Sequence, residues 1–164
     1  MNNQRPVFKK VENLLQDKNF NIDKVDRNRP WGGFYVIEED EAEEFIKEFF
    51  PHISLESFSI FSKLSPKILI VEPGKRLSWQ YHNRRSEIWR VIDGNVGLVM
   101  SETDEQKPVT KLSEGEYISL DQGIRHRLVG LDDWGIVAEI WQHTDPEDPS
   151  DEHDIVRLED DFGR

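Results

Sequence analysis

Cysteine is absent from this chain of 164 residues. Its absence excludes disulfide bridges, thiolate metal ligands and a cysteine nucleophile. Long apolar runs are also absent, since no segment approaches the roughly 18 residues that a membrane-spanning helix needs. The first ten residues are polar and lack the apolar core of a signal peptide. We therefore expect a cytoplasmic protein that does not bind membranes.

Basic residues are few. Lys and Arg number 21 against 33 Asp and Glu, which gives a formal net charge of −12. A general nucleic-acid binder needs a basic face for phosphate contacts, so this function class is excluded. Apolar residues still make up 36 % of the chain, with nine Phe and five Trp. That content is enough for the hydrophobic core of one domain.

Residues 1–28 are predicted to form an N-terminal arm. Its apolar positions recur at the spacing of a short amphipathic helix: Val7, Val11, Leu14 and Leu15. The stretch 19–29 is polar and turn-rich, and the following Arg-Pro-Trp-Gly-Gly-Phe-Tyr at 29–35 indicates a turn that enters a strand. The arm is thus expected to lie outside the main domain.

The segment 38–50 is predicted to be a helix inserted in the main domain. Acidic residues crowd its first half, where the helix dipole favours negative charge. Its apolar residues mark one helical face: Ala42, Phe45, Ile46, Phe49 and Phe50. Pro51 ends it, and we expect it to pack on the outside of a sheet.

From residue 55 onward the apolar period changes to two, which is typical of strands. The predicted strands, separated by glycine-containing turns, are 57–62, 67–72, 78–81, 87–92, 95–100, 110–112, 117–120, 125–128 and 135–141. Many short strands at this spacing favour an antiparallel sandwich or barrel. We expect one barrel over 29–144, followed over 145–164 by an acidic linker and a C-terminal block that packs on the barrel.

Four side chains are candidates for one metal site. Gln80 and His82 are two residues apart, so on a strand they share a face. Glu87 opens the next strand and can face them, and His126 follows a glycine turn further along. One carboxylate, two imidazoles and an amide suit a borderline divalent cation. Zinc is the first choice, with manganese, iron, cobalt or nickel as alternatives.

The spacing of these residues resembles that of the cupin superfamily. The first cupin motif is similar to the segment from Gly74 to Gly94, which holds Gln80, His82 and Glu87, with Gln in place of its first His. The second motif is similar to 115–126, which ends at His126 and has Asp where Pro is usual. This resemblance implies a mainly β fold, a double-stranded β-helix or jelly-roll barrel, with a metal inside.

A narrower resemblance is to the isomerase domain of type II mannose-6-phosphate isomerases. It rests on the segments 29–32, 71–82, 85–89 and 126–128, and above all on the final block 154–164. The resemblance implies interconversion of mannose 6-phosphate and fructose 6-phosphate, with Gln80, His82, Glu87 and His126 as metal ligands. It also implies a homodimer. In that family the domain often accompanies a guanylyltransferase half, and we expect this chain to be a stand-alone form without it.

The chain departs from that family at three positions. Asn83 and Arg84 stand where the family has further histidines, and Ile88 stands where it has a histidine after the ligand Glu. These departures keep a non-catalytic sugar-binding or regulatory cupin open as an alternative. An iron-dependent cupin oxygenase is a weaker alternative, because an amide ligand is a poor donor for an oxygen-activating metal.

An isomerase also needs a proton-transfer base and cations for the phosphate. Glu139 is the candidate base, since the alternation of its strand would point it inward, and Lys67 is a weaker candidate. Arg85 is the candidate catalytic cation. Lys75, Arg76 and Arg157 are further candidates for phosphate binding, because an acidic protein needs local cations to hold a sugar phosphate.

Overall fold

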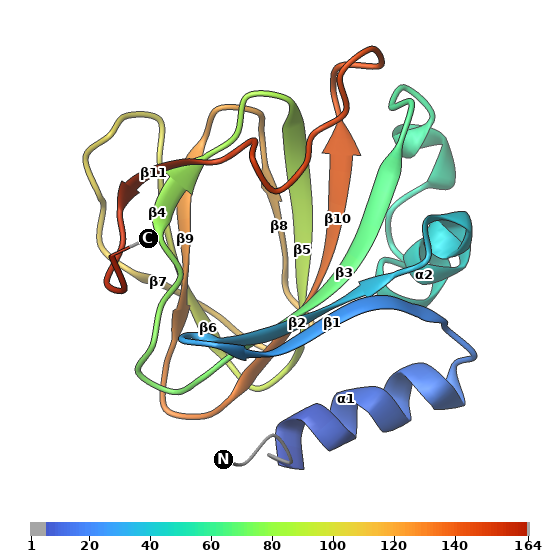
Figure 1. Cartoon of the computed structure of the whole chain (residues 1–164), viewed down its shortest axis with the longest axis horizontal. Coiled ribbons are helices and arrows are strands. Elements are labelled where there is room, and N and C mark those ends of the chain that lie inside the picture. Colours follow the sequence, from blue (N-terminus) through green and yellow to red (C-terminus); the bar gives the residue numbers. More distant parts are fainter. Residues whose placement is uncertain (1–5, 164) are drawn as a thin grey trace.

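The computed structural model describes residues 6–163, so the first five residues of the predicted arm and Arg164 lie outside it. Two helices, two short 3-10 segments and eleven strands make up these residues (Figure 1). In chain order they are α1 Pro6–Asp17, β1 Ile22–Arg29, β2 Gly32–Ile37, η1 Glu39–Glu41, α2 Ala42–Phe49, η2 Leu55–Phe58, β3 Leu64–Val71, β4 Trp79–Tyr81, β5 Arg85–Asp93, β6 Val96–Ser101, β7 Thr110–Leu112, β8 Tyr117–Leu120, β9 Arg125–Gly130, β10 Gly135–His143 and β11 Val156–Glu159. None of the helices in this part of the chain is long and apolar enough to cross a bilayer.

The strands form two sheets that face each other (Figure 1). One has six strands in the order β1-β2-β3-β10-β5-β8, and the other has five in the order β11-β4-β9-β6-β7. All strand pairs in them are antiparallel. The expected mainly β architecture of two antiparallel sheets is confirmed.

Two apolar clusters follow from alternation along the strands. On β3, Leu69 and Val71 point between the sheets, while Ile68 and Ile70 point to the outer face of the six-stranded sheet. The helices cover that outer face, where Phe8 of α1 and Phe45 of α2 are buried. The predicted helix over 38–50 is therefore confirmed on the outside of a sheet. Because the helices cover the outer face, they do not occupy the space between the two sheets.

The structure differs from the sequence-based prediction at the N-terminal arm. The polar segment expected to be turn-rich contains β1, which pairs with β2 and forms one edge of the six-stranded sheet. An edge strand tolerates polar residues on both faces, and most of β1 is exposed, so its sequence carries no clear alternation. Only α1 matches the expected helical arm.

The predicted strand over 57–62 is wrong, because the segment begins in the 3-10 helix η2 and no strand follows before β3. Serine hydroxyls explain this. Ser54 caps η2 by accepting the backbone N–H of Glu56, and the hydroxyls of Ser57 and Ser59 donate to backbone carbonyls three residues earlier. Such local hydrogen bonds compete with strand pairing.

Residues 144–155, here called the C-terminal strap, lead from the six-stranded sheet to the five-stranded sheet (Figure 1). Asp154 is buried, and its carboxylate accepts the backbone N–H groups of Asn83 and Arg84, both at 2.9 Å. The hydroxyl of Ser150 donates to the same carboxylate at 2.6 Å. The strap is thereby fixed to the connection between β4 and β5.

His143 directly precedes the strap and is hydrogen-bonded to it at Ser150. The backbone N–H of Ser150 donates to its Nδ1 at 2.9 Å, so Nδ1 must be unprotonated and Nε2 donates to the Ser65 hydroxyl at 2.8 Å. Burial lowers the pKa of His143 to about 4, with Lys63 and Arg85 adding to this effect and Glu39 and Asp154 opposing it.

We expect the neutral His143 to make folding sensitive to acid. Between about pH 6.5 and pH 4 the unfolded chain binds a proton at this histidine that the folded protein does not bind. The contribution of His143 to the free energy of unfolding is therefore fully present above this window, and it falls by about 2–3 kcal/mol as the pH is lowered through it. The measurement is urea denaturation at several pH values. His143→Asn keeps an acceptor for Ser150 but cannot titrate, and an equally steep pH dependence in that variant would contradict the assignment.

Candidate metal centre

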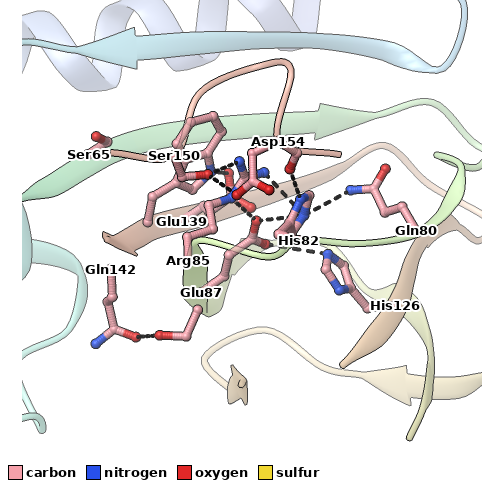
Figure 2. A network of polar contacts seen from close by, with 12 residues as sticks. Ser65, Gln80, His82, Arg85, Glu87, His126, Glu139, Gln142, Ser150 and Asp154 are labelled. Atoms are coloured by element: carbon pink, nitrogen blue, oxygen red, sulfur yellow. Dashed lines mark hydrogen bonds and ion pairs between the residues drawn. The ribbon is translucent and has the colours of Figure 1, made fainter. Parts of the chain in front are cut away.

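The two sheets bring three buried side chains to one point: His82, Glu87 and His126. His82 directly follows β4, and His126 lies on β9, both in the five-stranded sheet. Glu87 comes from β5 of the opposite sheet. Gln80 is the direct strand partner of His126, so it lies beside them. The segments that the sequence analysis singled out therefore meet between the sheets (Figure 2).

The distances suit a shared cation. The possible ligand atoms of the three residues lie within 4.8 Å of one another. Nε2 of His82 is 3.2 Å from one oxygen of Glu87, and Nε2 of His126 is 3.6 Å from the other. A group of two imidazoles and one carboxylate would bind a first-row divalent ion.

Backbone carbonyls set the tautomer of both imidazoles. Nδ1 of His82 donates to the carbonyl of Asp154 at 2.7 Å, and Nδ1 of His126 donates to the carbonyl of Ile124 at 3.0 Å. Each Nε2 therefore presents its lone pair to the centre. Hydrogen bonds of this kind orient metal-binding histidines in known sites.

His126 gives the test of whether a metal fits. Its Nε2 is buried and has no hydrogen-bond partner among residues 6–163. Buried polar atoms are nearly always satisfied, so this lone pair indicates a missing electrophile. Burial lowers the pKa of His126 to about 4, which keeps the ring neutral as a metal ligand must be. The residues present thus fit a divalent cation.

Glu87 stays ionised although it is buried. Burial alone would raise its pKa, but the adjacent guanidinium of Arg85 holds the pKa well below the ordinary value. The indole N–H of Trp89 also donates to this carboxylate at 3.0 Å. The site therefore holds a negative charge for a cation.

Gln80 differs from the other three in its orientation. Its amide oxygen accepts the hydroxyl of Ser78, while its amide nitrogen lies 3.4 Å from Nε2 of His82. Coordination by the amide oxygen requires a rotation of the amide group by about half a turn. Gln80 is in place as a fourth ligand only after that rotation.

Arg85 lies in the shell around these groups. Its guanidinium stacks on Trp141 at 3.5 Å and donates to Glu87 at 2.8 Å, to Ser150 at 2.9 Å and to the carbonyl of Asp151 at 3.2 Å. It also donates to Nε2 of His82 at 3.1 Å, a contact that a metal bound there would displace. Arg85 is therefore engaged with the centre and the strap, where sequence analysis expected a catalytic or phosphate-binding cation.

Glu139 lies beside the centre on β10. Its two oxygens accept the indole N–H groups of Trp89 at 2.8 Å and of Trp141 at 2.9 Å. Burial and the nearby charge of Glu87 raise the pKa of Glu139 to about 8. Trp89 thus orients the carboxylates of both Glu87 and Glu139, a role that the sequence did not predict. Trp79, by contrast, is buried and donates its indole N–H to the carbonyl of Asp104.

A cavity of about 320 Å³ opens onto the centre. Its lining includes Gln80, Arg85, Glu87, His126 and Glu139. Of the cations expected to bind phosphate, Arg85 and Arg157 are part of the lining. Lys75 and Arg76 lie outside it, and Arg76 forms a bidentate ion pair with Asp161. Arg29, at the end of β1, and Trp31, directly before β2, line the cavity too, and the sequence gives no signal for that role.

Comparisons with known proteins identify the family of this chain. Residues 38–160 match the family model described as mannose-6-phosphate isomerase C-terminal. The xanthan biosynthesis protein XanB of Xanthomonas campestris pv. campestris is 29 % identical over 125 residues, which cover 76 % of this chain and 25 % of XanB. The chain thus spans about a quarter of that relative.

Solved structures show the same fold at low identity. Oxalate decarboxylase from Bacillus subtilis at pH 4.6 superposes with a TM-score of 0.57 and 14 % identity, covering 84 % of this chain and 32 % of that one. The Lactobacillus farciminis oxalate decarboxylase formate complex gives 0.55 and 13 %, with coverages of 82 % and 33 %. Both are cupins, and at this identity the likeness concerns the fold alone. The chain has a cupin fold and belongs to the mannose-6-phosphate isomerase C-terminal family.

Proposed function

We propose that this protein is a metal-dependent aldose–ketose isomerase that acts on a sugar phosphate, with mannose 6-phosphate and fructose 6-phosphate as the first pair to test. The observation that carries the proposal is the buried, unpartnered Nε2 of His126 beside His82 and Glu87, at the end of a cavity. Family membership supports the reaction class.

His82, Glu87 and His126 would hold the metal, with Gln80 as a fourth ligand after its amide rotates. A bound divalent cation would supply Lewis acidity toward the sugar carbonyl. Zinc is the expected ion, with manganese, iron, cobalt or nickel as alternatives. The net charge of one dication and one carboxylate is near +1, which favours the negative charge that develops on the carbonyl oxygen.

Glu139 is the proposed proton carrier. As a carboxylate it would take the proton from C2 of the aldose, and the released electron pair would form the C1–C2 double bond as the carbonyl oxygen gains a proton. Returning the carried proton to C1 and removing the proton from the C2 hydroxyl gives the ketose. Two indole donors hold the Glu139 carboxylate in one orientation, which supports this role.

Replacement of His82 or Glu87 by Ala is expected to abolish stoichiometric metal binding. Each change removes one of three donors, and the loss of Glu87 also removes the charge that attracts the cation. Metal content after loading with zinc, measured by elemental analysis, is the readout. His52→Ala removes an exposed histidine outside the centre and should bind metal normally. Metal retained by both His82→Ala and Glu87→Ala would refute the ligand assignment.

Glu139→Gln is expected to lower kcat by about 10²–10⁴-fold, because the amide cannot carry a proton. Its metal content should remain that of the unchanged protein. Activity is followed by proton exchange at C2 of mannose 6-phosphate in deuterated water, with the exposed Glu105→Gln as the matched control. Undiminished exchange would exclude Glu139 as the base.

The same assay separates the isomerase from its main alternative. Metal-loaded protein that binds mannose 6-phosphate but exchanges no proton would favour the non-catalytic sugar-binding cupin. The homodimer expected from the sequence stays a prediction, and light scattering coupled to size-exclusion chromatography would test it.

A further inference from the structure

One wall of the cavity alternates cationic and aromatic side chains. The guanidinium of Arg29 lies 5.4 Å from the ring centroid of Phe34, and the ammonium of Lys67 lies 4.3 Å from the same centroid. Lys67 is also 4.8 Å from the ring of Trp141. All four residues line the cavity that opens onto the metal centre. Strands β2, β3 and β10 are neighbours in the six-stranded sheet, so this wall is continuous.

Lys67 makes no direct ion pair. Within residues 6–163 its ammonium makes no hydrogen bond or ion pair, and its close contacts are the two aromatic faces. Its cross-strand partner is Glu139, and the charges of Glu139, Glu87 and Glu152 act on the ammonium without contacting it. Burial lowers the pKa of Lys67, and an anion held against the ammonium would favour its charged form.

A second unpartnered donor belongs to the same wall. The indole N–H of Trp31 is buried and has no acceptor in the part of the chain that the structure describes. Trp31 lies between Arg29 and Phe34 in the sequence and lines the same cavity. Arg29 forms an ion pair with Asp26 through its Nε at 3.2 Å. A guanidinium, an ammonium and an N–H donor without an acceptor are together the chemistry of an anion site.

The wall stands at a suitable distance from the metal centre. Lys67 is on β3 and Glu87 is on β5, with β10 between them. Two strand spacings separate the backbones by about 9–10 Å. In a hexose 6-phosphate the phosphate and the carbonyl group occupy opposite ends of the carbon chain. One molecule can therefore face the centre with its carbonyl end and the wall with its phosphate.

We propose that Lys67 and Arg29 form the anion-binding end of this cavity and receive the phosphate monoester of the sugar substrate. The assignment rests on the proposed isomerase function for the identity of the sugar. It replaces Lys75 and Arg76, which lie outside the cavity, and Arg85, whose guanidinium is engaged with the centre and the strap.

The test is calorimetric binding of mannose 6-phosphate, mannose and inorganic phosphate to the zinc-loaded protein. We expect Lys67→Met and Arg29→Gln each to weaken binding of mannose 6-phosphate about tenfold or more, the loss of one charge-assisted contact. Neutral mannose should bind the variants as it binds the unchanged protein. In turnover, KM should rise by the same factor in both variants, and kcat of Arg29→Gln should change less than about threefold. Lys67→Met also removes a charge that lowers the pKa of Glu139, so only KM is compared for that variant.

Control variants separate charge from folding. Lys111→Met removes an exposed lysine on β7 and should leave binding unchanged, and Lys67→Arg should keep most of the affinity because it keeps the charge. If Lys67→Met does not fold, Arg29→Gln and Lys67→Arg still decide the matter.

The outcomes for the site and for the function are distinguishable. Phosphate binding that depends on Lys67, without proton exchange, would uphold the anion site and refute the isomerase. Isomerase activity with unchanged KM in Lys67→Met and Arg29→Gln would refute the anion site alone. Failure of the unchanged protein to bind either mannose 6-phosphate or inorganic phosphate would also overturn it.

Discussion

The site depends on one buried negative charge, the carboxylate of Glu87, at the interface of two sheets. A carboxylate there is unfavourable unless cationic or donor groups surround it, and here they come from Arg85 and Trp89. Arg85 and Trp89 lie on β5 with Glu87, and His82 directly follows β4 of the opposite sheet, so the groups around this charge span both sheets. Charge balance at Glu87 therefore links the packing of the barrel to the ability to hold a cation.

The cavity places different chemistry at its two ends. Near Glu87 and His126, donors with free lone pairs face a point that suits a cation, and near Lys67 an ammonium that makes no direct ion pair within the described residues suits an anion. Glu139 lies between them in the strand register, since it is the direct partner of both Lys67 and Trp89. A ligand that bridges the ends would pass this carboxylate. The fold thus sets the order of groups that the proposed reaction needs.

Much of this arrangement could be predicted from the chain itself. Apolar runs and turn residues located β5, β8 and β10, and helical spacing located α2, which buries one regular face. The spacing of His82, Glu87 and His126 predicted their meeting, which the structure bears out geometrically. Lys67 and Arg29 were harder to assign as anion-binding residues, since they enter the cavity only through sheet register between distant strands. Lys75 and Arg76 adjoin the motif in sequence, but that nearness does not determine which way they face.

The orientation of both histidines comes from main-chain oxygens, at Asp154 for His82 and at Ile124 for His126. Every amino acid supplies that oxygen, so a point mutation at Ile124 leaves the acceptor in place. At Asp154 the side chain also holds the strap in position, so there the carbonyl depends on the carboxylate as well. What the imidazoles do not tolerate is a change in loop length, because an insertion or deletion there would move the carbonyl away from the ring.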